Sequence, residues 1–140
     1  MQLSDKLKRL ETNLNVLKEV REEIHSPEML EQNIRYEWEI RYGLLESIQI
    51  VIDIACKISA RFNLGNPRNY KECLELLAQH GYIDRDLMQK TTAMVGLRNL
   101  LVHEYTRLDR KRLIEYLDHL DDFHTFIREI TEHFLPESRE

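Results

Sequence analysis

Leucines at the start of the chain recur at alternating steps of four and three residues, a spacing that aligns side chains along one face of an α-helix. This seam consists of Leu3, Leu7, Leu10, Leu14 and Leu17. Only 4 Gly and 3 Pro occur among the 140 residues, which suits long helices and is too few for a turn-rich β protein. A single seam needs a partner surface, within the fold or on a second copy. We therefore expect an all-α protein.

A second, longer helix is predicted from the start signal Ser26-Pro27-Glu28, in which serine can cap the helix and proline fits its first turn. The apolar pattern continues to about Phe62, so this helix would form the spine of a bundle or extend into a dimer. Its stripe consists of Leu30, Ile34, Trp38, Leu45, Ile48, Ile52 and Ala55. We expect Trp38 in the core. Residues 63–67, Asn-Leu-Gly-Asn-Pro, form the clearest loop.

Three further helices are expected after this loop. A short one runs from about Tyr70 to His80 and ends at Gly81, a natural residue after a helix end. Asp84 and Asp109 are placed to cap the other two. The last helix has the stripe Leu113, Tyr116, Leu117, Leu120, Phe123, Ile127, Ile130 and Phe134. We predict one domain over residues 1–140, an up-and-down bundle of four main helices and one short helix, with a disordered tail at 136–140.

Composition limits the function classes. The net charge of −5 argues against a general polyanion binder, so contact with nucleic acid needs a local basic patch. Arg107, Arg110, Lys111 and Arg112 form a candidate patch, or else a solvated loop and helix start. No apolar run approaches the ~20 residues that span a bilayer. The first residues lead directly into the amphipathic pattern, and we expect a cytoplasmic protein with no membrane association.

The two cysteines, Cys56 and Cys73, lie among apolar residues without the spacing of metal ligands. We expect buried, reduced thiols and no disulfide framework. No group of His, Asp or Glu has convincing ligand spacing either, and no glycine-rich phosphate loop occurs. The sequence thus predicts no metal site and no cofactor.

The residues suited to chemistry lie in one stretch, Arg98-Asn99-Leu100-Leu101-Val102-His103-Glu104-Tyr105. Arginine offers a fixed planar cation for phosphate, and histidine exchanges a proton near neutral pH. On a straight helix with about 100° per residue, Arg98 and Tyr105 share a face, whereas His103 lies about 140° from Arg98. Arg98 and His103 therefore meet only if the helix kinks, if the arginine curls across, or if substrate lies between them. Gly96 is a candidate for such flexibility.

These residues suggest metal-independent cleavage of RNA. His103 would act as general base on a ribose 2′-hydroxyl, and Arg98 would stabilise the phosphorane-like transition state. The products would be a 2′,3′-cyclic phosphate and a free 5′-hydroxyl. Asn99, one turn before His103, would orient the imidazole or touch RNA, and Tyr105 would stack on a base or bond to phosphate.

Asp53 interrupts the apolar run from Ile48 to Ala55, and an acid in a mostly buried helix costs free energy unless it is paired. One interpretation is that Asp53 bonds Arg98 or His103 and holds it in place. The other, which we favour on sequence alone, is a charge at the edge of the bundle. Glu46 lies seven residues earlier on nearly the same face and is interpreted in the same way.

The pattern of Arg98, Asn99, His103 and Tyr105 resembles that of the HepT-like ribonuclease toxins of the HEPN superfamily. The lead-in Met94-Val95-Gly96-Leu97 and the following Asp109 resemble that family too, and the likeness is sharpest from Pro67 to Asp109. The resemblance implies a homodimer whose two motifs line a shared cleft. It also implies an MntA-like nucleotidyltransferase antitoxin, of a type VII-like toxin–antitoxin system, that transfers AMP from ATP onto the motif tyrosine, here Tyr105.

Two hypotheses follow. The first is an endoribonuclease toxin, acting on mRNA or tRNA, in which Arg98 and His103 are essential. The second is a non-catalytic helical dimer that serves as a binding scaffold for a nucleotidyltransferase partner. The acidic net charge favours the second, and the intact set of Arg, His and Tyr favours the first.

Overall fold

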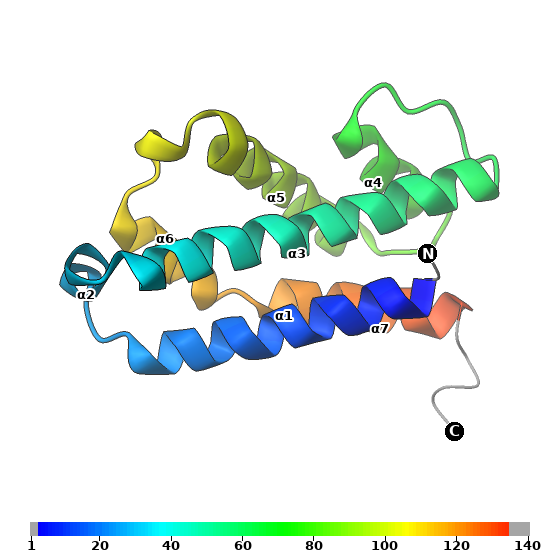
Figure 1. Ribbon diagram of the computed structural model, residues 1–140. Helices are drawn as coiled ribbons and strands as arrows, with labels where there is room; N and C mark the ends of the chain where they lie inside the picture. Colours follow the sequence, from blue (N-terminus) through cyan, green and yellow to red (C-terminus); the bar gives the residue numbers. More distant parts are fainter. Residues whose placement is uncertain (1–2, 135–140) are drawn as a thin grey trace.

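The computed structural model describes residues 3–134, and these residues form an all-α bundle (Figure 1). Its elements are α1 (Leu3–Glu23), α2 (Pro27–Gln32), α3 (Ile34–Arg61), α4 (Tyr70–Gln79), α5 (Arg85–His103), the 3-10 turn η1 (Tyr105–Arg107), α6 (Arg110–Leu117) and α7 (Asp121–Phe134). The predicted all-α fold class is confirmed. The described residues contain seven α-helices rather than the predicted five, because the second and the last predicted helices are each divided in two. The predicted tail at 136–140 lies outside the described residues, and the single domain over residues 1–140 stays a prediction.

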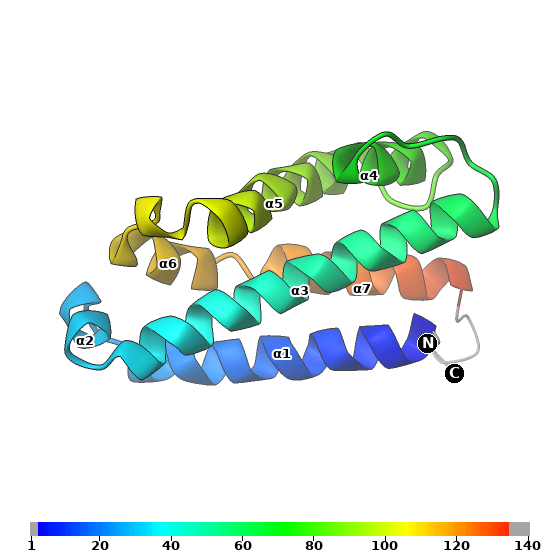
Figure 2. The same cartoon turned by 45° about the horizontal axis from the view of Figure 1, so that its top comes forward.

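The leucine seam of α1 finds its partner within the fold. Leu7, Leu10, Leu14 and Leu17 are buried, and α1 packs along α3 (Figure 2). Gly43 allows this close approach, because a Cβ added there would lie 2.6 Å from Leu17 Cδ2. The glycine therefore sets how near α1 can come to α3.

The predicted helix from Pro27 to Phe62 is wrong in one respect, because it is broken at Asn33 into α2 and α3. Asn33 has extended backbone angles, φ −137° and ψ 95°. Its side-chain oxygen accepts a hydrogen bond from the Arg35 N–H at 3.1 Å, and its own N–H donates to the Met29 carbonyl at 3.0 Å. Asn33 thus ends one helix and caps the next, so the chain turns without leaving these backbone groups unpaired.

The last predicted helix is also broken, at residues 118–120, into α6 and α7. The predicted cap at Asp109 is confirmed for α6, since its side chain accepts from the Arg112 N–H at 2.8 Å. At the break, Asp118 accepts from Arg21 Nε of α1 at 2.8 Å. Leu120 is buried between the two helices. A tertiary ion pair and a buried leucine thus hold a turn that the apolar stripe did not reveal.

The helix α5 begins and α4 ends as the sequence predicts. Gly81 has φ +80°, the left-handed conformation that glycine adopts without steric cost. The Asp84 side chain accepts from the Leu87 N–H at 2.8 Å and caps α5. The loop at residues 63–67 is also confirmed. These local signals direct α5 along α3 and α4, which positions the candidate site.

The prediction of reduced cysteines is contradicted, because Cys56 of α3 and Cys73 of α4 form a disulfide with Cα atoms 5.0 Å apart. The two residues are separated by 17 positions, and this spacing is not one that indicates a disulfide. They meet because α4 packs against the C-terminal part of α3. Ser59 supports this junction, since its buried hydroxyl donates to the Ala55 carbonyl at 2.9 Å.

Trp38 is not a core residue, contrary to the prediction. Its side chain is 61% exposed, and Ile34 and Tyr42, one turn to either side on α3, are also exposed. The core lies on the other faces of α3, where Ile40, Leu44, Ile48 and Val51 are buried. In the part of the chain that the structure describes, no helix has the length and apolar content needed to cross a bilayer.

Candidate active site on the fifth helix

The helix α5 ends at His103, so the motif is split between a helix and a turn. Glu104 leaves the helix at φ −138° and ψ 44°, and its N–H donates to the Leu100 carbonyl at 2.9 Å. Its carboxylate accepts from Arg107 Nη1 at 2.7 Å, which closes η1. Tyr105 belongs to this turn, so the predicted shared helix face of Arg98 and Tyr105 is wrong. Gly96 lies inside the uninterrupted helix.

Arg98 is held between α3, α4 and its own helix. Its Nε donates to Gln49 Oε1 at 3.2 Å, and its Nη1 donates to Asn99 Oδ1 at 3.1 Å. The guanidinium carbon lies 5.3 Å from the centre of the Tyr70 ring, within the range of a cation–π contact. Nη2 has no hydrogen-bond partner among residues 3–134. Arg98 is therefore a half-buried, positioned cation with a donor left over.

Gln49 connects Arg98 to Asp53. The Gln49 Nε2 donates to Asp53 Oδ1 at 2.9 Å, and Asp53 Oδ2 pairs with Lys6 Nζ at 3.6 Å. A carboxylate only accepts and a guanidinium only donates, so one orientation of the Gln49 amide satisfies both neighbours. Asp53 does not contact Arg98 or His103 directly; it lies at the bundle edge, 41% exposed, and acts on Arg98 through Gln49.

His103 differs from Arg98 in having no side-chain partner among residues 3–134. Its side chain is exposed at the end of α5 and makes no hydrogen bond or ion pair within the described part of the chain. Asn99, expected to orient it from one turn earlier, accepts from Arg98 instead. The structure therefore does not bring Arg98 and His103 together within one chain. The imidazole remains open to a substrate or a second protein.

Tyr105 lies in the wall of an open groove of about 710 Å³. The groove is bounded by α2, the start of α3, η1 and the start of α6, all at one end of the molecule (Figure 1). Its lining includes Glu28, Glu31, Glu37, Trp38, Arg41, Asp109, Arg110 and Lys111. Tyr105 is 60% exposed, and its hydroxyl has no partner among the described residues. It is thus accessible for modification.

Most cations of the predicted basic patch are engaged within the chain. Arg107 pairs with Glu104 at 2.7 Å, and Arg110 pairs with Glu37 at 2.9 Å. Arg112 donates to the Tyr116 hydroxyl at 3.0 Å. Lys111 has no ion pair or hydrogen bond in residues 3–134. The patch is therefore weaker than its sequence suggests, and Lys111 is its most available charge.

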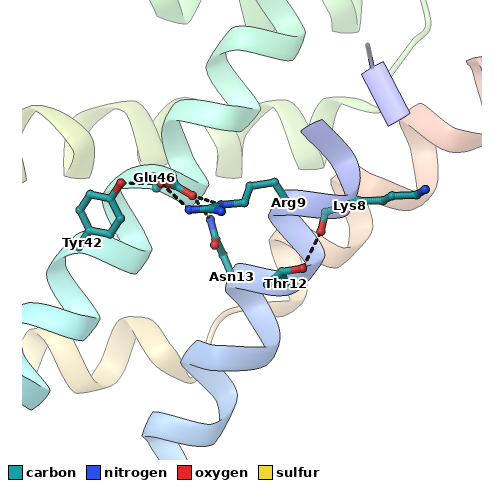
Figure 3. Close-up of polar contacts among 6 residues, drawn as sticks. All are labelled: Lys8, Arg9, Thr12, Asn13, Tyr42 and Glu46. Carbon is teal, nitrogen blue, oxygen red and sulfur yellow. Dashed lines mark hydrogen bonds and ion pairs between the residues drawn. The ribbon is translucent and has the colours of Figure 1, made fainter. Parts of the chain in front are cut away.

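A polar cluster joins α1 to α3 (Figure 3). The Glu46 carboxylate accepts hydrogen bonds from three side chains. They come from Arg9, from the Tyr42 hydroxyl at 2.6 Å, and from Asn13 Nδ2 at 3.0 Å. These hydrogen bonds, that from Arg9 foremost, lower the pKa of Glu46 to about 2. Sequence reasoning treated Glu46 as an edge charge; it is instead the acceptor that holds α1 against α3, three residues before Gln49.

Sequence reasoning missed Gln49 and Tyr70, the partners of Arg98. Gln49 stands one helical turn before Asp53, which is the only local hint of a connection. Tyr70 follows a loop and begins α4, and the sequence around it gives no sign that it contacts α5. Within residues 3–134, no group of three or more His, Cys, Asp or Glu is placed to hold a metal ion.

Known proteins resemble this chain along most of its length. The ribonuclease HepT-like family model matches residues 10–130. The mRNA nuclease HepT of Shewanella oneidensis is 36% identical over 86 residues, which span 61% of this chain and 65% of that protein. A solved tri-AMPylated HEPN toxin of Shewanella oneidensis, in complex with an MNT antitoxin, is 27% identical with a TM-score of 0.83, over 94% of this chain and 99% of that one.

A second solved structure, of a toxin–antitoxin with AMP-PNP, is 26% identical with a TM-score of 0.83, over 93% of this chain and 97% of that one. The family match contains the whole of α3 and α5, and therefore Gln49, Arg98 and His103. The chain belongs to the ribonuclease HepT-like family.

Proposed function

We propose that this protein is an endoribonuclease toxin that cleaves RNA by transesterification and needs no metal ion. The observation that carries the proposal is the contrast between two residues of α5. Arg98 is held by Gln49 and Tyr70, whereas His103 is exposed and has no side-chain partner among residues 3–134. A fixed cation suits a developing phosphorane charge, and a free imidazole suits proton transfer. An RNA substrate agrees with a location in the cytoplasm.

In the proposed step, the ribose 2′-oxygen forms a bond to the adjacent phosphorus as His103 takes its proton. The bond from phosphorus to the 5′-oxygen breaks, and that oxygen takes a proton from a second histidine. Arg98 donates to the non-bridging oxygens with Nη2. In a homodimer the second copy supplies this histidine, its own His103, because each chain has only one. The products are a 2′,3′-cyclic phosphate and a 5′-hydroxyl.

The test is incubation of the purified protein with total RNA in EDTA, beside His103→Ala and the control His124→Ala. His124 is exposed on α7 and, like His103, has no side-chain partner in the described residues. We expect cyclic-phosphate ends from the wild type and His124→Ala, and none from His103→Ala. Full cleavage by folded His103→Ala, or loss of wild-type cleavage in EDTA, would contradict the mechanism.

We further propose that a nucleotidyltransferase antitoxin neutralises the toxin by AMPylation of Tyr105. The Tyr105 oxygen would attack the α-phosphorus of ATP and form an ester bond, pyrophosphate would leave, and the phenolic proton would pass to a base or solvent. The Tyr105 hydroxyl is exposed and has no partner in the part of the chain that the structure describes, which supports this assignment. The intact mass after incubation with antitoxin and ATP is the test, with Tyr105→Phe and the equally exposed Tyr42→Phe compared.

The alternative is a non-catalytic dimer that binds the nucleotidyltransferase. One observation favours it: Arg98 and His103 do not meet within the chain, and Arg98 is engaged by protein groups. Under this hypothesis His103→Ala would leave growth arrest and RNA integrity unchanged, while the complex with the antitoxin would still form.

A further inference from the structure

We propose that the groove beside Tyr105 is a nucleotide-binding site that holds the AMP group attached to that tyrosine. The inference rests on the proposed AMPylation of Tyr105 and adds where the nucleotide goes. Under this proposal the modification does more than add bulk. The adenosine leaves the solvent, docks between α2, α3 and α6, and so holds the new phosphate next to the catalytic helix.

The size and position of the groove fit this role. Its volume of about 710 Å³ lies within the roughly 300–1,000 Å³ typical of small-molecule sites. Tyr105 is in its wall, so a group on the tyrosine oxygen enters it without a long linker. The catalytic Arg98 and His103 do not line the groove. A nucleotide there would therefore leave both residues in place, and its phosphate would be attached two positions after His103 in the chain.

Trp38 supplies a stacking surface for the base. It lies in the same groove as Tyr105, on the first turns of α3, with 61% of its side chain exposed. An indole that contributes so little to the core is not needed there for folding. Bases stack on such rings, and stacking needs no particular sequence. Trp38 thus faces the site as the structure stands, without a rearrangement.

The charges favour one tethered nucleotide over a strand of RNA. Arg110 and Lys111 offer positive charge near Tyr105, and Lys111 has no partner in residues 3–134. Four acids, Glu28, Glu31, Glu37 and Asp109, line the same groove. A polyanion laid along it would meet these carboxylates, whereas a single phosphodiester anchored at Tyr105 meets the cations. Glu37 is already paired with Arg41 at 2.9 Å and with Arg110 at 2.9 Å.

Three further residues in the groove have unused hydrogen-bonding capacity. Arg41 Nη1 is buried and has no hydrogen-bond partner among the described residues. Such an orphaned donor is rare, and a ribose or phosphate oxygen would satisfy it. The carboxylates of Glu28 and Glu31 make no hydrogen bond or ion pair within residues 3–134. Their carboxylates can accept from the exocyclic amino group of adenine, which uracil lacks.

Trp38 is the only tryptophan of the chain, so its fluorescence reports on this groove alone. The toxin would be incubated with its antitoxin and ATP, separated from the antitoxin, weighed, and excited where adenine does not absorb. In protein whose mass shows AMP, we expect emission reduced about twofold and lower access to acrylamide. An AMP-bearing protein with unchanged emission and acrylamide access would overturn the site.

If the mass shows no AMP, the proposed AMPylation fails and the groove is tested on its own. Free AMP and UMP would then be titrated into the unmodified protein. Saturable quenching by AMP, and weaker quenching by UMP, supports the site, and no quenching by either overturns it. A short uncleavable RNA that quenches Trp38 more strongly than AMP also overturns it, in favour of a site for the RNA substrate.

A second measurement uses the stability of the adduct. The AMP on Trp38→Ala should be removed by an added phosphodiesterase at least about fivefold faster than from the wild type, because its base no longer stacks. Tyr42→Ala is the matched control, since Tyr42 is exposed on the next turn of α3 and does not line the groove. Equal removal rates for all three proteins would contradict the docking of the nucleotide.

Discussion

Gln49 on α3 accepts a hydrogen bond from Arg98 on α5, and the two residues are 49 positions apart in the chain. The Gln49 amide is in turn oriented by Asp53, which accepts from its nitrogen at 2.9 Å. A neutral amide can therefore orient the guanidinium and leave its positive charge intact. A carboxylate in the same place would neutralise that charge. This relationship explains how a family member with an acidic net charge presents a cation at the motif.

Replacing Gln49 with leucine should impair cleavage more than folding. A hydrogen bond to a charged group contributes about 1.5–3 kcal/mol, so the loss of position should lower kcat roughly 10- to 100-fold. KM should change less, because the charge of Arg98 remains. Steady-state cleavage of a labelled RNA measures both constants, and thermal unfolding measures the stability.

Asp53→Asn and Gln89→Leu are the comparisons for this variant. Asn at 53 can donate as well as accept, so it no longer dictates the amide orientation, and an intermediate loss of kcat is expected. Gln89 is exposed on α5 and should tolerate leucine without loss. A Gln49→Leu enzyme with wild-type kcat would show that Arg98 does not depend on Gln49.

Glu46 should make stability depend on acid pH. Its pKa of about 2 in the folded protein lies below the ordinary value of 4.5, so its contribution is complete above pH 4.5 and is lost as the pH falls toward 2. Because Arg9 is 57% exposed, solvent screening reduces this contribution to about 1–2 kcal/mol. Urea unfolding of wild type and Glu46→Gln should differ by this amount at pH 7 and converge near pH 2. A constant difference across that range would contradict the assignment.

Two glycines on helices should respond oppositely to alanine. At Gly43 a Cβ would lie 2.6 Å from Leu17 Cδ2 in the packed contact of α1 and α3, so Gly43→Ala should destabilise by about 1–3 kcal/mol. At Gly96, apart from its chain neighbours and the backbone of its own helix, no atom of residues 3–134 lies within 4 Å of an added Cβ, so Gly96→Ala should stabilise by up to about 1 kcal/mol through helix propensity. Chemical denaturation measures both. Equal effects at the two positions would mean that α1 can move away from α3 at little cost.

Sequence patterns predicted the parts of the fold that local chemistry decides. The capping aspartates Asp84 and Asp109 and the left-handed Gly81 act within a few residues, and all three are confirmed. The breaks at Asn33 and at residues 118–120 were missed because the apolar stripe continues through them. Each break is stabilised by partners that the stripe does not reveal, such as Arg21 from α1 at Asp118.

The candidate site likewise has one part that the sequence reveals and another that it does not. The identities of Arg98, His103 and Tyr105 are visible in the sequence, because their residue types carry the chemistry. Their surroundings are not: Gln49 and Tyr70 reach Arg98 only through the packing of α3 and α4 on α5. The exposure of Trp38 was missed for a related reason, since a tryptophan on an apolar stripe gives no sign of which neighbours cover it.

Arg98 and His103 point away from each other by about 140° on one helix, so we expect their functional pairing to occur between two copies. Co-expressed Arg98→Ala and His103→Ala chains should form mixed dimers in which one site combines the intact His103 of one chain with the intact Arg98 of the other. RNA cleavage by the mixture should exceed that of either variant alone by at least about tenfold, because each pure dimer lacks one of the two groups in both chains. It should stay below that of the wild type, because the mixed dimer has a single His103 and water must protonate the leaving oxygen. Activity no greater than that of the two separate variants, with mixed dimers verified by differently tagged chains, would place the pairing within one chain.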